Sequence, residues 1–253
     1  MSITRNHITG NIPVELFTTS MPRLRYLNLY ANRLIGSIPL NEISSYNASS
    51  SLESLNLDSN FLSGPLVSEI GLLSTLTHLN IGFNDFDRKL PTEIGNLSLL
   101  KELVITGNSF SGRLPSEIGQ LSNTLEVLLM DQNLFFGSIP VQYYSQLSKL
   151  RDFNLAGSGT GGTLPSEIGL ALSNNLERLD LRYNNFVGTI PSEIGLLTKL
   201  GILLLENNDF TGSMPNEVCN NTFDQLVVDC YDSISSKGVQ CDIPSCCSFC
   251  RKD

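Results

Sequence analysis

Leu24-Arg25-Tyr26-Leu27-Asn28-Leu29-Tyr30-Ala31-Asn32 is followed four residues later by Gly36-Ser37-Ile38-Pro39, and the combined pattern, L-x-L-x-x-N-x-x-x-G-x-[IL]-P, recurs down almost the whole chain. The closing position of the first part recurs every 24 to 28 residues, at Asn6, Asn32, Asn60, Asn84, Asn108, Asn133, Ser158, Asn184 and Asn208. Self-similarity at this period indicates a repeat array in which each unit buries its apolar side against its neighbours. We therefore expect a single solenoid of about nine repeats.

The first half of each repeat has the pattern of a short strand. Its leucines alternate with polar or aromatic residues, so Leu27 and Leu29 should point inward from a strand with one buried face. The closing asparagine can both donate and accept hydrogen bonds, and stacked copies can satisfy backbone groups where the chain leaves the strand. Ser158 lacks the amide and lies in the glycine-rich run 157–162. We therefore expect repeat seven to be the loosest.

The second half of each repeat predicts a short helical turn on the convex side. Pro-Ser-Glu-Ile-Gly begins at Pro115, Pro165 and Pro191, which places proline at a first helical position, an acidic residue in the first turn and glycine at the end. The acidic positions form a row: Glu69, Glu93, Glu117, Glu167, Glu193 and Glu217. Such a row could hold a cation, but its members are a whole repeat apart and have no other ligand cluster beside them. Solvated helix starts are the stronger interpretation, and we expect neither a metal nor another cofactor.

The full repeat, L-x-x-L-x-L-x-x-N-x-x-x-G-x-[IL]-P, resembles the plant-specific class of leucine-rich repeats, and the match covers roughly residues 3 to 228. This class occurs in receptor-like kinase ectodomains, receptor-like proteins and polygalacturonase-inhibiting proteins. The resemblance implies an α/β solenoid, a right-handed superhelix with a concave parallel β-sheet and often a second small sheet from the G-x-[IL]-P segment. Arg88 replaces the glycine of repeat four, and Pro65 is shifted in repeat three. Such ectodomains usually begin with a cap that contains tryptophan, which this chain lacks, so we expect that cap to be missing.

Composition limits the classes of partner. The chain of 253 residues has 16 lysines and arginines against 25 acidic residues, a net charge of −9, which disfavours nucleic acid and anionic lipid. Its apolar runs are too short to cross a bilayer, so we expect no membrane insertion by this segment. The amino-terminal residues enter directly into a strand pattern, as in a chain cut from a longer one. We expect a repeat array over residues 1–223 and a cap over 224–253.

All six cysteines lie in the last 35 residues, at Cys219, Cys230, Cys241, Cys246, Cys247 and Cys250. An even number in a short loop-rich segment favours disulfides in an oxidising compartment. Cys247-x-x-Cys250 leaves zinc binding or a redox motif open as alternatives. The tail also resembles the cysteine-rich end of leucine-rich repeat proteins from diatoms and related algae, which are thought to be largely cell-surface proteins. Asn47, Asn96 and Asn220 fit the glycosylation acceptor pattern.

The strand residues that flank the buried leucines should face the concave surface, and two groups of them are candidates for binding. Tyr26, Tyr30, His78 and Phe83 form an aromatic group near the amino end, and Arg178, Asp180, Arg182 and Tyr183 form a charged group later. Aromatic residues and arginine are enriched at the centres of binding sites. The alternative is ordinary strand surface, with Arg178 and Arg182 in local ion pairs with Asp180.

Three functions remain open from the sequence. The first is a ligand-recognising ectodomain of a cell-surface, receptor-like protein that binds a protein or peptide on its concave face. The second is a secreted inhibitor of a wall-degrading enzyme, like the polygalacturonase-inhibiting proteins, and the third is a structural or adhesion repeat. An enzyme is disfavoured, because His7 and His78 are the only histidines and no nucleophile motif accompanies them.

Overall fold

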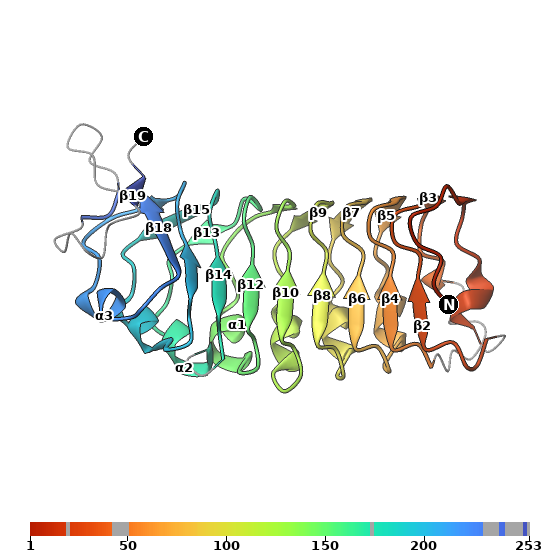
Figure 1. Ribbon diagram of the computed structural model, residues 1–253, viewed down its shortest axis with the longest axis horizontal. Helices are drawn as coiled ribbons and strands as arrows, with labels where there is room; N and C mark the ends of the chain where they lie inside the picture. Colours follow the sequence, from red (N-terminus) through yellow and green to blue (C-terminus); the bar gives the residue numbers. More distant parts are fainter. Residues whose placement is uncertain (19–20, 42–50, 173–174, 230–237, 241–249, 252–253) are drawn as a thin grey trace.

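The computed structural model describes residues 1–18, 21–41, 51–172, 175–229, 238–240 and 250–251. They form a solenoid whose strands lie side by side along the long axis, with the two termini at opposite ends (Figure 1). The predicted leucine-rich repeat fold is confirmed.

The first strand of each repeat contributes to a parallel ten-stranded sheet, called the main sheet here. Its pairing register places Leu27 beside Leu55 and Leu55 beside Leu79, so equivalent leucines stack from repeat to repeat. These leucines are at most 1% exposed, which confirms that the leucine pattern marks the buried side of the strands. In spatial order the strands are β2 (Tyr26–Asn28), β4 (Ser54–Asn56), β6 (His78–Asn80), β8 (Glu102–Val104), β10 (Val127–Leu129), β12 (Asp152–Asn154), β14 (Arg178–Asp180), β16 (Ile202–Leu204), β18 (Gln225–Asp229) and β19 (Cys250–Arg251).

The asparagines that close the strand pattern are called the ladder asparagines here. A second row of parallel strands follows them in the chain and lies along the upper edge in Figure 1. Six strands form one sheet: β1 (Thr9–Gly10), β3 (Arg33–Gly36), β5 (Phe61–Pro65), β7 (Asp85–Lys89), β9 (Ser109–Gly112) and β11 (Leu134–Phe135). Three more form another: β13 (Gly161–Gly162), β15 (Asn185–Gly188) and β17 (Asp209–Phe210). Between these sheets the described pairing is reduced to an isolated bridge, Ser138 to Gly161.

Repeat seven, where the second row divides, is nevertheless closely packed. Ser158 and Thr160 are fully buried, and the Ser158 hydroxyl donates to the Met130 carbonyl at 3.0 Å. A Cβ on Gly161 would lie 2.4 Å from the Asn185 carbonyl oxygen. The glycine-rich run is therefore a place of close backbone approach, and not the open loop that its composition suggests.

Short helices cover the side opposite the main sheet, as the Pro-Ser-Glu-Ile-Gly pattern predicts. Most are 3-10 turns. The proline is not at the first helical position, where the pattern predicts it, but one residue before, at Pro91, Pro115 and Pro191, where the backbone is still extended. The glycines of these helices allow the repeats to approach: a Cβ on Gly95 would lie 2.5 Å from the Glu117 carbonyl oxygen. The helices are η1 (Val14–Phe17), η3 (Ser68–Leu72), η4 (Thr92–Asn96), η5 (Ser116–Leu121), α1 (Val141–Gln146), α2 (Ile168–Ala171), η7 (Ser192–Leu196) and α3 (Asn216–Cys219).

The core runs the length of the array as one leucine-rich column, with phenylalanines beneath the second row of strands. Phe86 and Phe110 stack with ring centroids 6.1 Å apart, and Phe186 and Phe210 with centroids 6.0 Å apart. The main sheet continues through β18, past the boundary expected at residue 223, so the start of the cap is not marked by a break in the sheet. None of the helices in the described part of the chain has the length and hydropathy to span a membrane.

Candidate ligand-binding face

The outward residues of the main sheet, together with the residues that directly follow each strand, form the main-sheet face. On this face the aromatic group expected from the sequence is divided between the strands and the residues that follow them. Tyr26 and His78 lie in the same register of β2 and β6, with Ser54 between them. Tyr30 and Phe83 lie beyond the carboxyl ends of these strands. Tyr26 and His78 therefore share one row of the face, whereas Tyr30 and Phe83 do not share a second one, because Ala31 is the residue equivalent to Phe83.

Charged neighbours hold the two tyrosines of the aromatic group. The Arg25 guanidinium lies 5.7 Å from the Tyr26 ring centroid and donates to Glu53 at 2.6 Å, and the Tyr26 hydroxyl donates to the same carboxylate at 3.1 Å. The hydrogen bond from Arg25 lowers the pKa of Glu53. Arg5 lies 5.8 Å from the centroid of the Tyr30 ring, which is half-buried. His78 and Phe83 are exposed, and Nδ1 of His78 lies 2.8 Å from the Thr77 hydroxyl.

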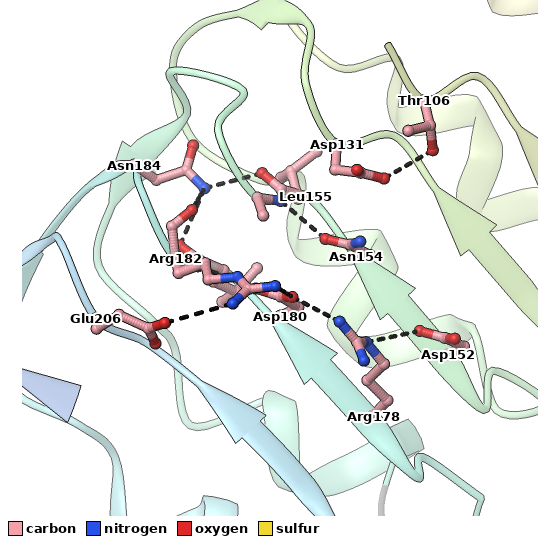
Figure 2. Close-up of polar contacts among 12 residues, drawn as sticks. Thr106, Asp131, Asp152, Asn154, Leu155, Arg178, Asp180, Arg182, Asn184 and Glu206 are labelled. Carbon is pink, nitrogen blue, oxygen red and sulfur yellow. Dashed lines mark hydrogen bonds and ion pairs between the residues drawn. The ribbon is translucent and has the colours of Figure 1, made fainter. Parts of the chain in front are cut away.

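The charged group forms one network around Asp180, and Figure 2 shows both arginines converging on this carboxylate. Arg178 Nη2 donates to Asp180 Oδ2 at 2.7 Å, and Arg182 Nη2 lies 3.1 Å from the same oxygen. The network extends to the two neighbouring strands, since Arg178 Nε lies 3.7 Å from Asp152 Oδ1 and Arg182 Nη1 lies 3.6 Å from Glu206 Oε1. The geometry is thus that of local ion pairs, the alternative left open by the sequence.

Asp180 cannot contact a partner directly, which corrects its assignment as a binding residue. Its side chain is fully buried, because the two arginines cover it. A buried carboxylate needs such hydrogen-bonded cations to offset its desolvation. Asp180 is therefore a positioning residue that holds Arg178 and Arg182, whose side chains remain 31% and 35% exposed on the face.

Asp131 and Asp152 complete this region, and sequence reasoning did not single them out. Burial raises the pKa of Asp131, against the hydrogen bond that its Oδ1 accepts from the Thr106 hydroxyl at 2.7 Å. Burial also raises the pKa of Asp152, although Arg178 lowers it. The carboxylate of Asp180 raises both pKa values further. The sequence signal for these residues is their position, Asp152 in the outward column of β12 and Asp131 two residues after the end of β10.

An apolar centre separates the aromatic and charged groups. Val127 and Leu129 are the outward, half-buried residues of β10, and Val104 lies beside Leu129 on β8. The amino-terminal strands carry asparagines in the same column, at Asn28, Asn56 and Asn80. The main-sheet face therefore changes its chemistry along the array.

Comparison with known proteins agrees with this geometry. The family model described as Leucine Rich Repeat matches residues 51–73, 75–97, 99–121 and 175–197. The array is a leucine-rich repeat solenoid. No curated protein sequence matches the chain significantly.

Two of the similar solved structures are ectodomains of plant receptor kinases. The ectodomain of the membrane receptor kinase GASSHO1/SCHENGEN3 from Arabidopsis thaliana, in complex with CASPARIAN STRIP INTEGRITY FACTOR 2, is 41% identical at a TM-score of 0.78. That alignment covers 85% of this chain and 25% of the receptor chain. The Arabidopsis receptor kinase HAESA, in complex with the peptide hormone IDA and the co-receptor SERK1, is 31% identical at a TM-score of 0.81, with 89% and 36% covered. This chain thus spans well under half the length of either receptor chain.

A plant ice-binding protein is also similar in structure. It is 25% identical at a TM-score of 0.75, and the alignment covers 89% of this chain and 70% of that one.

The convex side of the repeat array carries the glutamate row and two of the expected glycosylation sites. The glutamates of the row before Glu217 are half-buried, and Ser116 and Ser192 donate hydroxyl hydrogen bonds to Glu117 and Glu193 at 3.3 Å. Asn96 and Asn220 are exposed at the ends of η4 and α3, and Asn47 lies outside the described residues. Among the residues described, no group of three His, Cys, Asp or Glu is placed to hold a metal ion.

Only one cysteine side chain belongs to the described part of the chain. Cys219, at the end of α3, is half-buried against the core and disulfide-bonded. Cys230, Cys241, Cys246 and Cys247 lie outside the described residues, and Cys250 is described only as backbone in β19. Disulfides across the rest of the tail remain a prediction.

Proposed function

We propose that this chain is the ligand-recognising part of an extracellular, receptor-like leucine-rich repeat protein, and that a peptide or protein binds its main-sheet face. The fold and the likeness to receptor ectodomains in complex with peptides support this proposal. The disulfide at Cys219 agrees with an extracellular location. Attachment to the plasma membrane through another part of the parent protein belongs to the same proposal.

The observation that carries the proposal is the uneven chemistry of the main-sheet face. The aromatic group and the asparagine column lie together on β2 to β6, and the apolar centre and then the charged network follow them toward β16. Specific recognition requires such variation, because a partner can then be fitted in only one register. The convex phrase Pro-Ser-Glu-Ile-Gly, by contrast, recurs nearly unchanged.

The dimensions of the face suit an extended ligand. Eight strand steps separate β2 from β18, which is roughly 38 Å at the usual spacing of parallel strands. An extended peptide of about eleven residues covers this length. The strands of the main sheet are paired without interruption from β2 to β18. A ligand that crosses them therefore contacts side chains from successive repeats.

The composition of the main-sheet face argues against ice binding as the function of this chain. An ice lattice is periodic, so a surface that binds it has to repeat with a matching period. The outward residues of β6, β10 and β14 instead begin with His78, Val127 and Arg178. We therefore expect the purified protein to show no thermal hysteresis.

A display experiment with two opposed variants tests the proposed function. A phage library of random decapeptides is selected on the purified protein, and the enriched peptides are titrated against variants. We expect Val127→Arg to abolish binding, because a long charged side chain would occupy the apolar centre of the main-sheet face. The convex control, Glu117→Ala with Glu193→Ala, should bind as the wild type does. Binding lost through the glutamates and kept in Val127→Arg would place the interface on the convex side.

A further inference from the structure

The residue before each ladder asparagine has the same unusual backbone, and we call it the rim position. It has a positive φ in every repeat, because the chain turns there from the main sheet toward the second row of strands. A left-handed conformation costs free energy in any residue that has a Cβ, and glycine avoids that cost. The rim position holds Arg5, Ala31, Ser59, Phe83, Gly107, Gln132, Gly157, Tyr183 and Asn207.

Two rim residues combine this strain with exposed rings. Phe83 has φ 46° and Tyr183 has φ 55°, and bulky residues are true outliers in this region. The two residues are 52% and 53% exposed, so burial in the core does not offset the strain. Residues held in such strained backbone conformations cluster at functional sites.

The neighbouring repeat provides a seat for the Phe83 ring. A Cβ on Gly107 would lie 2.7 Å from Phe83 Cδ1, so the ring occupies the space that any other residue at position 107 would need. One side of the ring rests on this glycine, and the residue remains half exposed. The seat fixes the ring as a preformed contact surface, which lowers the entropy that is lost on binding.

The rim between the two aromatic residues has few side chains. Phe83 follows β6 and Tyr183 follows β14, four strand steps away, which is about 19 Å. Gly107, Gln132 and Gly157 occupy the intervening rim positions. An extended segment of about six residues spans this interval.

A carboxylate lies near the middle of the interval. Asp131 precedes the rim residue Gln132, after β10, the strand midway between β6 and β14. The ion pairs in this region join Arg178 and Arg182 to Asp152, Asp180 and Glu206, and they leave Asp131 out. Asp131 is 8% exposed, whereas Asp180 is fully covered. It accepts a hydrogen bond from Thr106, a neutral donor, so a cationic group on a ligand would be the first ion-pair partner of Asp131 among these contacts.

We propose that Phe83 and Tyr183 anchor the two ends of an extended peptide segment of about six residues, and that Asp131 binds a basic side chain between them. The segment carries apolar side chains at its ends, where they stack on the two rings, and lysine or arginine between. This inference rests on the proposed function and names its ligand class.

Variants at the rim separate binding from folding. Peptides enriched on the wild type should carry two apolar residues about five positions apart with a lysine or arginine between them. Phe83→Gly and Tyr183→Gly should each weaken their binding by about 30-fold, the size of a hot-spot truncation. Both variants should unfold at the same or a higher denaturant concentration than the wild type, because glycine removes the left-handed strain. The matched control is Ala31→Gly, which makes the same backbone change outside the interval and should leave binding unchanged.

Asp131→Asn tests the basic side chain. It should weaken the enriched peptides by about 10-fold or more and leave unchanged the binding of analogues whose basic residue is replaced by methionine. Enriched peptides without a basic residue would overturn this part of the proposal. If the peptides bind both rim variants as tightly as the wild type, Phe83 and Tyr183 are not anchors. Unfolding of Phe83→Gly under conditions in which Ala31→Gly stays folded would also overturn this role, because it would show that Phe83 serves the fold. A library that yields no enriched peptide would sink the proposed function together with this inference.

Discussion

Tyr143 and Tyr144, consecutive residues of α1, show how a single hydroxyl group sets stability in this core. Both side chains are almost completely buried, and burial raises the pKa of each phenol. The Tyr143 hydroxyl donates to the Pro115 carbonyl at 2.9 Å, which ties one repeat to the next. The Tyr144 hydroxyl has no hydrogen-bond partner in the described structure. The two groups therefore contribute with opposite sign.

We predict that Tyr143→Phe lowers the free energy of unfolding by about 1 kcal/mol, because the buried Pro115 carbonyl loses the hydrogen bond from the phenol and keeps only the one from the Ile118 N–H at 3.3 Å. Tyr144→Phe should be neutral or should raise it by up to about 1 kcal/mol, because it removes an unpaired buried hydroxyl. Each variant is the control for the other in urea unfolding. A larger loss in Tyr144→Phe than in Tyr143→Phe would contradict the hydrogen-bond assignment.

Asp131 predicts a pH effect on stability. Burial and the nearby Asp180 carboxylate hold its pKa above the ordinary value of 3.8, while the Thr106 hydroxyl and Arg178 act in the opposite direction. The folded protein thus binds this proton more tightly than the unfolded chain, and stability falls as pH rises through the folded pKa. Asp131→Asn should therefore be more stable than the wild type at neutral pH, and the difference should vanish below pH 3.8. Thermal melts of both proteins across this pH range test the expectation. A lower melting temperature for Asp131→Asn at neutral pH would contradict it.

The asparagine ladder is the element that joins the two rows of strands. The Asn133 side-chain amide donates to the Ile105, Met130 and Asp131 carbonyls at 3.0 to 3.2 Å, and its oxygen accepts from the Phe110 N–H at 3.1 Å. Every one of these contacts is buried. The structural role predicted for this position is thereby explained in atomic terms.

Asn133→Ala should lower the free energy of unfolding by roughly 1 to 3 kcal/mol, because buried backbone groups lose their partners while the groups themselves remain. Asn184→Ala should behave alike, since its amide donates to the Leu155 carbonyl at 2.8 Å. Gln132→Ala, at the neighbouring exposed position, is the control and should change stability by less than about 0.5 kcal/mol. An unchanged melting curve for Asn133→Ala would show that the ladder adds no stability.

Elements were predictable where one period governs local pattern and packing together. The leucines of L-x-L and the ladder asparagines locate each strand, and Pro-Ser-Glu-Ile-Gly locates the convex turns. The close packing around Gly161 was not predictable, because glycine composition alone does not distinguish a loose loop from a close backbone approach. The outward columns identified the main-sheet face, but the burial of Asp180 depends on how the side chains of Arg178 and Arg182 fold back over it.

At the scale of the whole molecule, we expect the cysteine-rich segment to cap the last repeat of the array. Cys219 packs against the core and is disulfide-bonded. The other five cysteines follow within the last residues of the sequence. Such a cap would cover the apolar edge that the last repeat of a solenoid otherwise exposes.

We predict that all six cysteines are oxidised, so that intact mass measurement after alkylation under non-reducing, denaturing conditions finds no free thiol. The same protein reduced before alkylation is the control and should accept six labels. Zinc released in stoichiometric amount by a chelator would show instead that part of the tail binds metal.

Hydrogen–deuterium exchange of the whole chain, with and without an enriched peptide, tests most directly whether the main-sheet face is the binding surface. Protection should appear in the strands and rim residues from β6 to β14, including the segments around Phe83, Asp131 and Tyr183. The convex helices η4, η5 and η7 should exchange as in the free protein. Protection confined to those helices, or to the second row of strands, would contradict the assignment of the main-sheet face.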